Sequence, residues 1–373
     1  MSEKHLHIIT HDVPYPADFG GVIDAFYKIK SLHAIGVKIM LHCFTKKRPE
    51  QNILKEYCYS VNYYPRKMVV GISKSLPFII ASRKSNRLLK NLLKDDFPIL
   101  FEGIHTTYHL YKNNLKDRKC FIRILNVENI YYHYLAKNEN NIFKKIYFHI
   151  ESLILKEFEK NIANKAKILA LSTTDQEIYS KQFSAKDITY LSPFLPTTHL
   201  SSKFGVGNYV LYNGNLSVNE NEKAALWLIE NVFVNLKIPF VIAGFNPSQK
   251  LKVIAKKYNH ISIVANPSEI NMHLLIENAQ INILPSFNNT GVKFKLINSL
   301  YNGRHCLVNF AGVDGSGLNN LCYISETAIE FQNKVQNLFN EPFTQKEMQR
   351  RSTALKKLYN NEQNAQLISE MLL

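Results

Sequence analysis

The stretch LPSFNNTGVKFKLINSLYNG, residues 284–303, joins the end of an apolar strand to the start of a helix. Thr290 and Gly291 precede the expected helix, and Lys295 and Asn298 lie three residues apart on one face of it. The free N–H groups at a helix start attract anions, and a lysine there adds to the attraction. The stretch therefore predicts a phosphate site, with Lys295 on phosphate and Asn298 on sugar hydroxyls. The same residues are also compatible with an ordinary solvent-exposed first turn of a helix.

Strands and helical patterns alternate on both sides of a proline-rich linker, SPFLP at 192–196. The alternation predicts βαβ units and parallel sheets, and two prolines in five residues interrupt any strand or helix. We expect two successive α/β domains, residues 1–192 and 193–343, and a C-terminal helix over 344–373. The expected strands are His5–Thr10, Lys38–Phe44, Ser60–Tyr64, Ile99–Glu102, Lys119–Ile124, Lys167–Leu171 and Ile188–Leu191, then Tyr209–Asn213, Phe240–Ala243, Ile261–Val264, Ile281–Leu284 and Cys306–Asn309.

Composition limits the class of protein. Hydrophobic residues make up 46% and charged residues 20%, which is typical of globular domains and not of disordered chains. No apolar run approaches the ~18 residues of a membrane-spanning helix. The first residues contain no signal-peptide core, and the five cysteines include no C-x-x-C pair. These features predict a cytoplasmic protein with reduced thiols and no zinc site.

The formal net charge is +16, and no acidic residue occurs between positions 56 and 95. In the segment Gly71–Lys94 a basic helical pattern carries a leucine face that includes Leu88 and Leu92. One interpretation is peripheral docking on the anionic inner leaflet of a membrane. The other is that the leucines pack on the first sheet and the cations are solvated. Phe78 is the only aromatic residue among 66–94, so nucleic-acid binding is not expected.

Two further loops follow expected strands and precede helices. The first contains Gly20-Gly21, and the second contains Gly214-Asn215 before a polar helix start. Glycines at a helix start let backbone N–H groups approach a phosphate or a sugar, although a tight turn needs them as well. The chain has no G-x-G-x-x-G and no P-loop motif, which argues against a dehydrogenase or an ATPase.

In this order the motifs resemble nucleotide-sugar glycosyltransferases of the GT-B fold, most closely the large retaining family 4 group. The resemblance covers about residues 10–310 and rests on Pro14-Tyr-Pro-x-x-x-Gly20-Gly21, Arg123-x-x-Asn126-Val-Glu128, Leu171-Ser172-x-x-Asp175, Asn213-Gly214-Asn215-Leu and Gly291-x-x-x-Lys295-x-x-Asn298. It implies two Rossmann-like domains facing each other across a cleft, with the C-terminal helix crossing back to the first domain. It also implies a nucleotide-sugar donor, a glycan or lipid-linked glycan acceptor, and no metal or other cofactor.

The resemblance also implies a role for individual residues. The second domain would hold the donor, with Lys295 on the diphosphate and Asn298 on the ribose, beside Gly214, Asn215, Thr290 and Gly291. Gly20-Gly21 would close over the phosphates. The acceptor and the transferred sugar would lie near Asp18, Arg123, Asn126 and Glu128.

Three positions depart from the family pattern. Asn298 replaces the usual Glu, Asn215 the usual Arg, and Leu125 the usual His. That histidine's role would shift to His105, in the motif Glu102-Gly-Ile-His105 after another strand, and we take both residues as catalytic candidates. His105 could equally be a packed loop residue. The sequence thus predicts a hexosyltransferase-type enzyme, with retention and without metal. The alternative is an inactive GT-B subunit that binds a glycan or an activated sugar for a partner enzyme.

Overall fold

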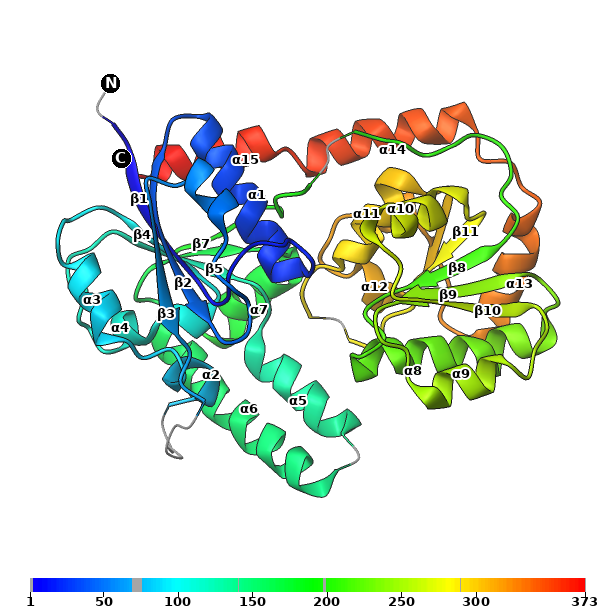
Figure 1. Cartoon of the computed structure of the whole chain (residues 1–373), viewed down its shortest axis with the longest axis horizontal. Coiled ribbons are helices and arrows are strands. Elements are labelled where there is room, and N and C mark those ends of the chain that lie inside the picture. Colours follow the sequence, from blue (N-terminus) through cyan, green and yellow to red (C-terminus); the bar gives the residue numbers. More distant parts are fainter. Residues whose placement is uncertain (1–2, 69–75, 140, 197–198, 289, 373) are drawn as a thin grey trace. The chain divides into compact units, whose positions relative to one another are not determined.

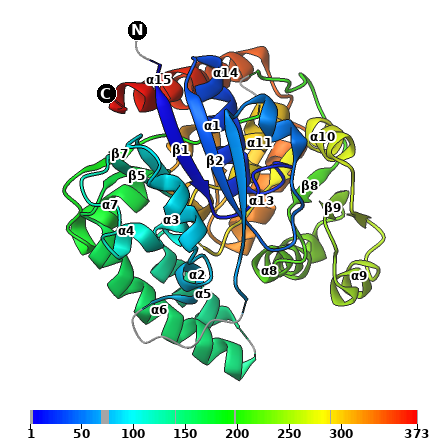
Figure 2. The ribbon, with the colours of Figure 1, turned by 60° about the vertical axis from the view of Figure 1, so that its left-hand side comes forward.

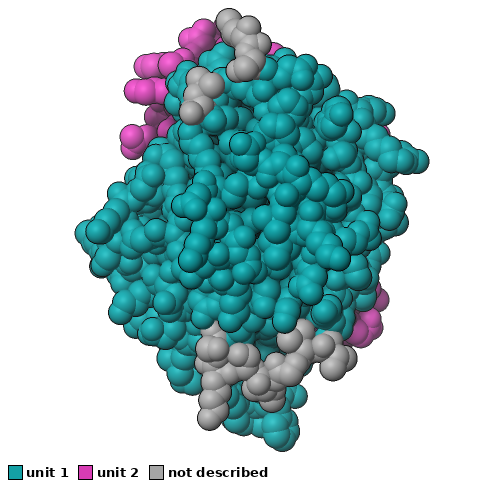
Figure 3. Space-filling model, turned by 90° about the vertical axis from the view of Figure 1, so that its left-hand side faces the viewer, with its two compact units in different colours: residues 1–196, 359–373 teal, residues 197–358 magenta. Residues whose placement is uncertain are grey.

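The computed structural model describes the chain except residues 1–2, 69–75, 140, 197–198, 289 and 373. The chain forms two compact units, residues 1–196 with 359–373 (unit 1) and residues 197–358 (unit 2). Figure 3 shows one face of the molecule with the two units in different colours. The division falls at the end of the proline-rich linker, four residues after the boundary expected from the sequence.

Unit 1 contains a seven-stranded parallel sheet in the order β3-β2-β1-β4-β5-β6-β7. Its strands are β1 His5–Thr10, β2 Lys38–Thr45, β3 Ser60–Pro65, β4 Ile99–Glu102, β5 Cys120–Ile124, β6 Lys167–Ala170 and β7 Ile188–Tyr190. Each of them overlaps one of the expected strands. The strand order reverses between β1 and β4, and ligands of such sheets bind at the carboxyl ends of the strands beside this point.

Helices cover both faces of this sheet (Figures 1 and 2). They are α1 Gly20–Ala34, α2 Phe78–Ala81, α3 Asn86–Leu92, α4 Tyr108–Tyr111, α5 Glu128–Asn138, α6 Ile142–Ile162, α7 Thr173–Gln182 and α15 Asn361–Met371, with 3₁₀ turns η1 Asn52–Glu56 and η2 Ile104–Thr106. Leu6 and Ile8 of β1 pack with α1 and α15, whereas Ile9 belongs to the core on the other face. This alternation follows from the two-residue period of a strand.

Unit 2 contains a six-stranded parallel sheet in the order β10-β9-β8-β11-β12-β13. The strands are β8 Val210–Asn213, β9 Phe240–Gly244, β10 Ile261–Ala265, β11 Ile281–Ile283, β12 His305–Val308 and β13 Tyr323–Ile324. The helices are α8 Asn219–Trp227, α9 Gln249–Ala255, α10 Glu269–Asn278, α11 Phe294–Asn302, α12 Phe310–Val313, α13 Ala328–Phe339 and α14 Gln345–Leu358, with short turns η3 Leu228–Val232, η4 Phe233–Asn235 and η5 Asn319–Leu321. Here the strand order reverses between β8 and β11.

The single helix expected over residues 344–373 is instead two helices, and this corrects the sequence-based prediction. The side chain of Asn360 accepts a hydrogen bond from the N–H of Gln363, so a new helix starts there. The second helix, α15, belongs to unit 1, where the Lys4 ammonium donates to the backbone oxygen and the hydroxyl of Ser369, each at 2.9 Å. The expected return of the C-terminal helix to the first domain is confirmed.

The basic segment Gly71–Lys94 is folded onto unit 1 where the structure describes it; its residues 71–75 lie outside the described part. Leu88 and Leu92 of α3 are 1% and 0% exposed and belong to the core. Arg83 is also buried and donates to the carbonyl oxygen of His11. Leu89 packs against the same core, and of the four leucines of the predicted face Leu93 alone is exposed, at 58%, so the structure favours packing for this segment.

Four charged side chains meet in the interior of unit 1, each with 0% exposure: Asp24, Lys28, Glu102 and Arg123. Arg123 of β5 binds the Asp24 carboxylate of α1 with two N–O distances of 3.0 Å. Lys28 lies 2.8 Å from Asp24 and 2.6 Å from Glu102 at the end of β4. Burial raises the pKa of Asp24, but Arg123 and Lys28 outweigh it and hold that pKa below its usual range. The pKa of Glu102 is raised, because burial dominates there.

The same network holds the start of the linker. Arg123 donates to the carbonyl oxygens of Leu191 and Ser192, at 2.6 and 3.1 Å, and the N–H of Phe194 donates to Asp24 at 2.8 Å. A guanidinium supplies five donors in a rigid fork, so one Arg123 joins α1, β5 and the linker.

We expect Arg123→Met to lower the free energy of unfolding of unit 1 by about 3–5 kcal/mol, because it leaves buried carboxylates with one cation fewer. Urea denaturation followed by circular dichroism measures the loss. The single tryptophan, Trp227 in α8, reports unit 2 separately by its fluorescence. Lys181→Ala, which breaks an exposed pair with Glu177 in α7, is the control and should leave the transition in place. An unchanged transition for Arg123→Met would contradict the structural role of the network.

Candidate functional site

In unit 2 the loops after β8 and β11 lie where the strand order reverses. The turn after β8 contains Gly214, and a side chain on the neighbouring Gly244, at the end of β9, would place its Cβ 1.8 Å from the Gly214 carbonyl oxygen. Only glycine fits at that position. After β11 the chain reaches Gly291, whose φ of +65° lies in the left-handed region that glycine adopts easily. Both loops therefore keep their backbone close to the strand ends.

Lys295 lies in the first turn of α11 and reaches across to the elements around β8. Its ammonium donates to the side-chain oxygen of Asn221 at 3.0 Å and lies 3.4 Å from the hydroxyl of Tyr212. It also lies 5.0 Å from the centre of the Tyr212 ring, within the range of a cation–π contact. Burial lowers the pKa of Lys295 to about 8, although Glu220 opposes the shift. The amine is therefore mostly charged at neutral pH.

Asn221 joins the two loops of this site. Its side-chain nitrogen donates to the backbone oxygen of Asn215 at 3.0 Å, while its oxygen accepts from Lys295. The starts of α8 and α11 are thus linked at the side of the sheet where ligands of this architecture bind. Neither Asn221 nor Tyr212 was among the residues selected from the sequence. Their positions on either side of the Asn213-Gly214 turn could have indicated both residues from the sequence.

The other donor-site candidates occupy the same two loops. Asn298 is exposed, one turn after Lys295, and accepts a hydrogen bond from the Asn302 side chain at 2.6 Å. Thr290 is buried and its hydroxyl lies 2.9 Å from the side-chain oxygen of Asn288. Asn215 is exposed. The structure thus groups a cation, two helix starts and exposed amide side chains, a combination suited to an anion carried by a polar ligand.

In unit 1, two histidines face each other at the carboxyl ends of β1 and β4. The ring centres of His11 and His105 lie 5.3 Å apart. The Nδ1 atom of each ring is buried and has no hydrogen-bond partner among the residues that the structure describes. Burial lowers the pKa of His11 to about 3 and that of His105 well below its usual value, and the nearby Arg83 adds to both shifts. Both rings are therefore neutral at physiological pH.

A buried carboxyl lies beside this pair. Glu128, the first residue of α5, has Oε1 3.9 Å from Nε2 of His105. Burial raises the pKa of Glu128 to about 7, against a hydrogen bond from the Asn126 side chain. Its backbone N–H donates to the carboxylate of Glu159 in α6 at 2.8 Å. Glu128 can therefore gain or lose a proton near neutral pH, which is a property suited to acid–base work or to holding hydroxyl groups.

Leu125 occupies the position where the resemblance led us to expect histidine. Its side chain lies against Gly21, since a Cβ there would meet Leu125 at 3.2 Å and His11 at 2.9 Å. A Cβ on Gly103 would lie 3.5 Å from Leu125 and 2.7 Å from His105. Leu125 and His105 thus border the same glycine.

Four of the unit 1 candidates lie outside this pair of histidines. Glu102 and Arg123 are fully buried in the interior network, so we reassign both to support of the fold. Asp18 is exposed and forms an ion pair with Arg48, at 2.7 Å. Gly20 begins α1, next to Gly21. The carboxyl that accompanies His105 is Glu128, which we had assigned only to the sugar region.

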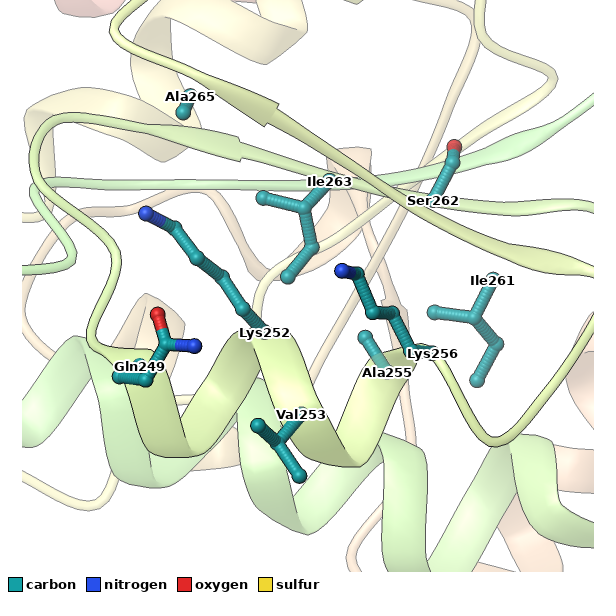
Figure 4. Close-up of a pocket in the computed structure, with 9 residues that line it drawn as sticks. All are labelled: Gln249, Lys252, Val253, Ala255, Lys256, Ile261, Ser262, Ile263 and Ala265. Carbon is teal, nitrogen blue, oxygen red and sulfur yellow. The ribbon is translucent and has the colours of Figure 1, made fainter.

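A separate groove lies at the edge of the unit 2 sheet, between α9 and β10, with a cavity volume of about 410 Å³. Figure 4 shows the side chains of Lys252 in α9 and of Lys256, the residue after α9, extending toward the strand. None of the residues predicted for the donor site lines this groove. It lies at the edge strand β10, which β9 separates from β8 and the reversal, so we do not assign the donor to it.

Two further properties concern the described residues as a whole. They contain no group of three or more His, Cys, Asp or Glu side chains placed to hold a metal ion. None of the helices in this part of the chain is both long enough and apolar enough to cross a bilayer.

Comparison with known proteins adds to this picture. No protein-family model matches the chain. The "uncharacterized 44.6 kDa protein in cps region" of Klebsiella pneumoniae is 29% identical over 335 residues, which is 84% of each chain.

The similar solved structures include several glycosyltransferases. Sucrose-phosphate synthase of Thermosynechococcus elongatus has a TM-score of 0.71 at 11% identity, covering 99% of this chain and 98% of its own. TarM, known from S. aureus, has a TM-score of 0.69 at 11% identity, covering 100% and 99%. Anabaena HepE, in complex with UDP and glucose, has a TM-score of 0.62 at 10% identity and covers 99% of each chain. The chain therefore has the GT-B fold of these enzymes, and the fold expected from the sequence is confirmed.

We expect Glu128→Gln to stabilise the protein more at pH 8 than at pH 5.5. A carboxyl whose pKa rises from 4.5 to about 7 on folding costs stability as pH increases through that range, and glutamine has no such cost. The gain should grow by roughly 1–2 kcal/mol between the two pH values. Urea denaturation at each pH measures it. Glu157→Gln, at an exposed position in α6, should show the same small effect at both pH values. A gain for Glu128→Gln that does not depend on pH would contradict the raised pKa.

Proposed function

We propose that this protein is a glycosyltransferase that moves a hexose-type sugar from a nucleotide-sugar donor to a glycan or lipid-linked glycan. Unit 2 binds the donor, and unit 1 supplies contacts to the acceptor and the transferred sugar. The observation that carries the proposal is Lys295, held by Asn221 and Tyr212 at the strand ends where the sheet order reverses. A mostly charged amine beside two helix starts suits a diphosphate.

The solved neighbours support the choice of donor. HepE is in complex with UDP and glucose, and a TarM mutant is in complex with UDP, α-GlcNAc-glycerol and fondaparinux. In unit 2, Asn298 is exposed one turn beyond Lys295, where an amide can bind ribose hydroxyls without adding charge. The likeness to the retaining family 4 group in the sequence motifs supports retention of configuration.

Catalysis in this proposal is mainly electrostatic. The leaving diphosphate is stabilised by Lys295 and by the N–H groups at the starts of α8 and α11, which are oriented before the reaction begins. No metal ion takes part. In unit 1 the neutral ring of His105 holds a hydroxyl of the transferred sugar, and Glu128 orients that ring.

A second candidate function is that of a GT-B subunit that binds an activated sugar or a glycan but has no activity of its own. The specific observation in its favour is the set of replacements Asn215, Asn298 and Leu125, which remove an arginine, a glutamate and a histidine from the family pattern. Slow hydrolysis of a nucleotide sugar separates the two functions, because an enzyme of this kind transfers to water and a binding subunit does not.

We expect Lys295→Ala to weaken binding of UDP at pH 7 by at least ~1.5 kcal/mol, about tenfold in Kd, because the diphosphate loses a charged hydrogen bond. Isothermal titration calorimetry measures the change. Lys252→Ala is the matched control, since it removes a lysine from the separate groove of the same unit. Equal affinity for UDP in Lys295→Ala and in the wild type would place the donor elsewhere.

We expect His105→Ala to reduce the rate of donor hydrolysis at least about tenfold while UDP affinity stays within twofold, because the contact strengthens at the transition state. Hydrolysis is measured across a set of UDP- and GDP-sugars. His133→Ala, at an exposed position in α5, is the control. An unchanged rate would exclude His105 from the reaction, and no hydrolysis by the wild type, despite UDP binding, would support the inactive subunit.

A further inference from the structure

The outer face of α6 exposes a continuous apolar stripe. Its six large side chains are between 42% and 80% exposed: Ile142, Phe143, Ile146, Tyr147, Ile150 and Leu153. Residues three and four positions apart lie on one face of a helix, so these side chains form one stripe about 17 Å long. Soluble chains rarely expose contiguous apolar patches of this kind unless the patch binds something.

The helix that carries the stripe is well supported on its other side. Leu155 and Phe158 are buried in the core of unit 1, and the Ser152 hydroxyl donates to the backbone oxygen of Asn129 in α5 at 2.9 Å. At the start of α6, the Asn141 side chain accepts from two backbone N–H groups at 3.1 Å. Figures 1 and 2 show α5 and α6 side by side, extending beyond the end of the unit 1 sheet. The stripe is thus presented on an ordered hairpin.

Positive charge accompanies the stripe. Lys144 and Lys145 are exposed on either side of it, and Lys156 is exposed farther along the helix. Residues 142–150 contain no acidic side chain. The next acid, Glu151, is buried, and its carboxylate accepts from the N–H of Phe78. The only exposed acid of α6, Glu157, lies beyond Leu153. The stripe is therefore apolar and flanked by cations.

We propose that the outer face of α6 is a docking surface for an anionic lipid bilayer. An amphipathic helix with large apolar side chains on one face and lysines beside them lies in the interface of such a membrane. The apolar side chains enter the boundary of the acyl chains, and the ammonium groups remain among the anionic headgroups. A second copy of the chain fits less well, because a symmetric contact would bring the same lysines together.

The surface lies on the same α5–α6 hairpin as Glu128 of the candidate site in unit 1. Glu128 begins α5, and the Glu159 carboxylate of α6 accepts hydrogen bonds from the N–H groups of Glu128 and Asn129, at 2.8 and 3.0 Å. The eleven residues of α5 span about 16 Å between Glu128 and the end of the hairpin that carries the stripe. A lipid-linked acceptor in a membrane docked on α6 could therefore reach the candidate site. This last step rests on the proposed function. The docking itself does not, and it lies on α6 instead of on the basic segment 71–94, for which docking was one of two interpretations.

Vesicle co-sedimentation tests the proposal with the full chain. The vesicles contain equal parts of phosphatidylcholine and phosphatidylglycerol, or phosphatidylcholine alone, each at low and raised salt. We expect the wild type to pellet with the anionic vesicles, less at raised salt and least with the neutral vesicles. The double variant Ile146→Glu, Ile150→Glu should bind the anionic vesicles at least about tenfold more weakly, because it puts carboxylates into the stripe.

The matched control is Ile270→Glu, Ile329→Glu, two isoleucines of unit 2 that are 74% and 67% exposed; it should pellet like the wild type. Equal pelleting of the α6 variant and the wild type would overturn the proposal, as would no pelleting of the wild type. A wild-type dimer in analytical ultracentrifugation that the α6 variant lacks, without vesicle binding, would make the stripe a protein interface instead. UDP affinity, measured in the same variants, should not change, so a failure of docking is distinct from a failure of the proposed function.

Discussion

The carboxylate of Asp24 accepts hydrogen bonds from β5, from the linker and from its own helix, α1. Its main partner, Arg123, has no exposed surface and also binds two carbonyl oxygens at the start of the linker. A buried pair of this kind costs desolvation of both ions, which only good geometry and further hydrogen bonds offset. Every partner must therefore keep its position. His11, His105 and Glu128 follow the ends of β1, β4 and β5, which are neighbouring strands, and Glu102 and Arg123 of the network belong to two of these strands.

In each candidate site, burial shifts the pKa of one ionisable side chain away from its usual value. Burial raises the pKa of Glu128 to about 7 and lowers that of Lys295 to about 8. Both shifts disfavour the charged form and therefore cost folding stability at neutral pH. Proteins tolerate such costs at functional sites. In unit 2 the cost is limited because Asn221 accepts from the amine, and in unit 1 because Asn126 donates to the carboxyl.

The strands and the reversal loops could be predicted because apolar runs, glycines and prolines act locally. The roles of Arg123 and Glu102 could not be predicted, because a sequence motif does not show whether a charged side chain points to a ligand or to Asp24. The break at Asn360 was missed because the helical pattern continues on both sides of it. The apolar residues of α6 were compatible with a buried helix, since both of its faces are apolar. Only the packing shows which face is covered.

Binding of a nucleoside diphosphate at the ends of β8 and β11 is the property on which the proposed donor site depends. Hydrogen exchange of the backbone, followed by mass spectrometry with and without saturating UDP, tests it most directly because it reads every peptide at once. UDP bound at these strand ends should slow exchange in peptides covering 212–221 and 284–298 and leave exchange unchanged in 249–265, which contains the separate groove. Protection confined to 249–265, or no protection anywhere in unit 2, would contradict it.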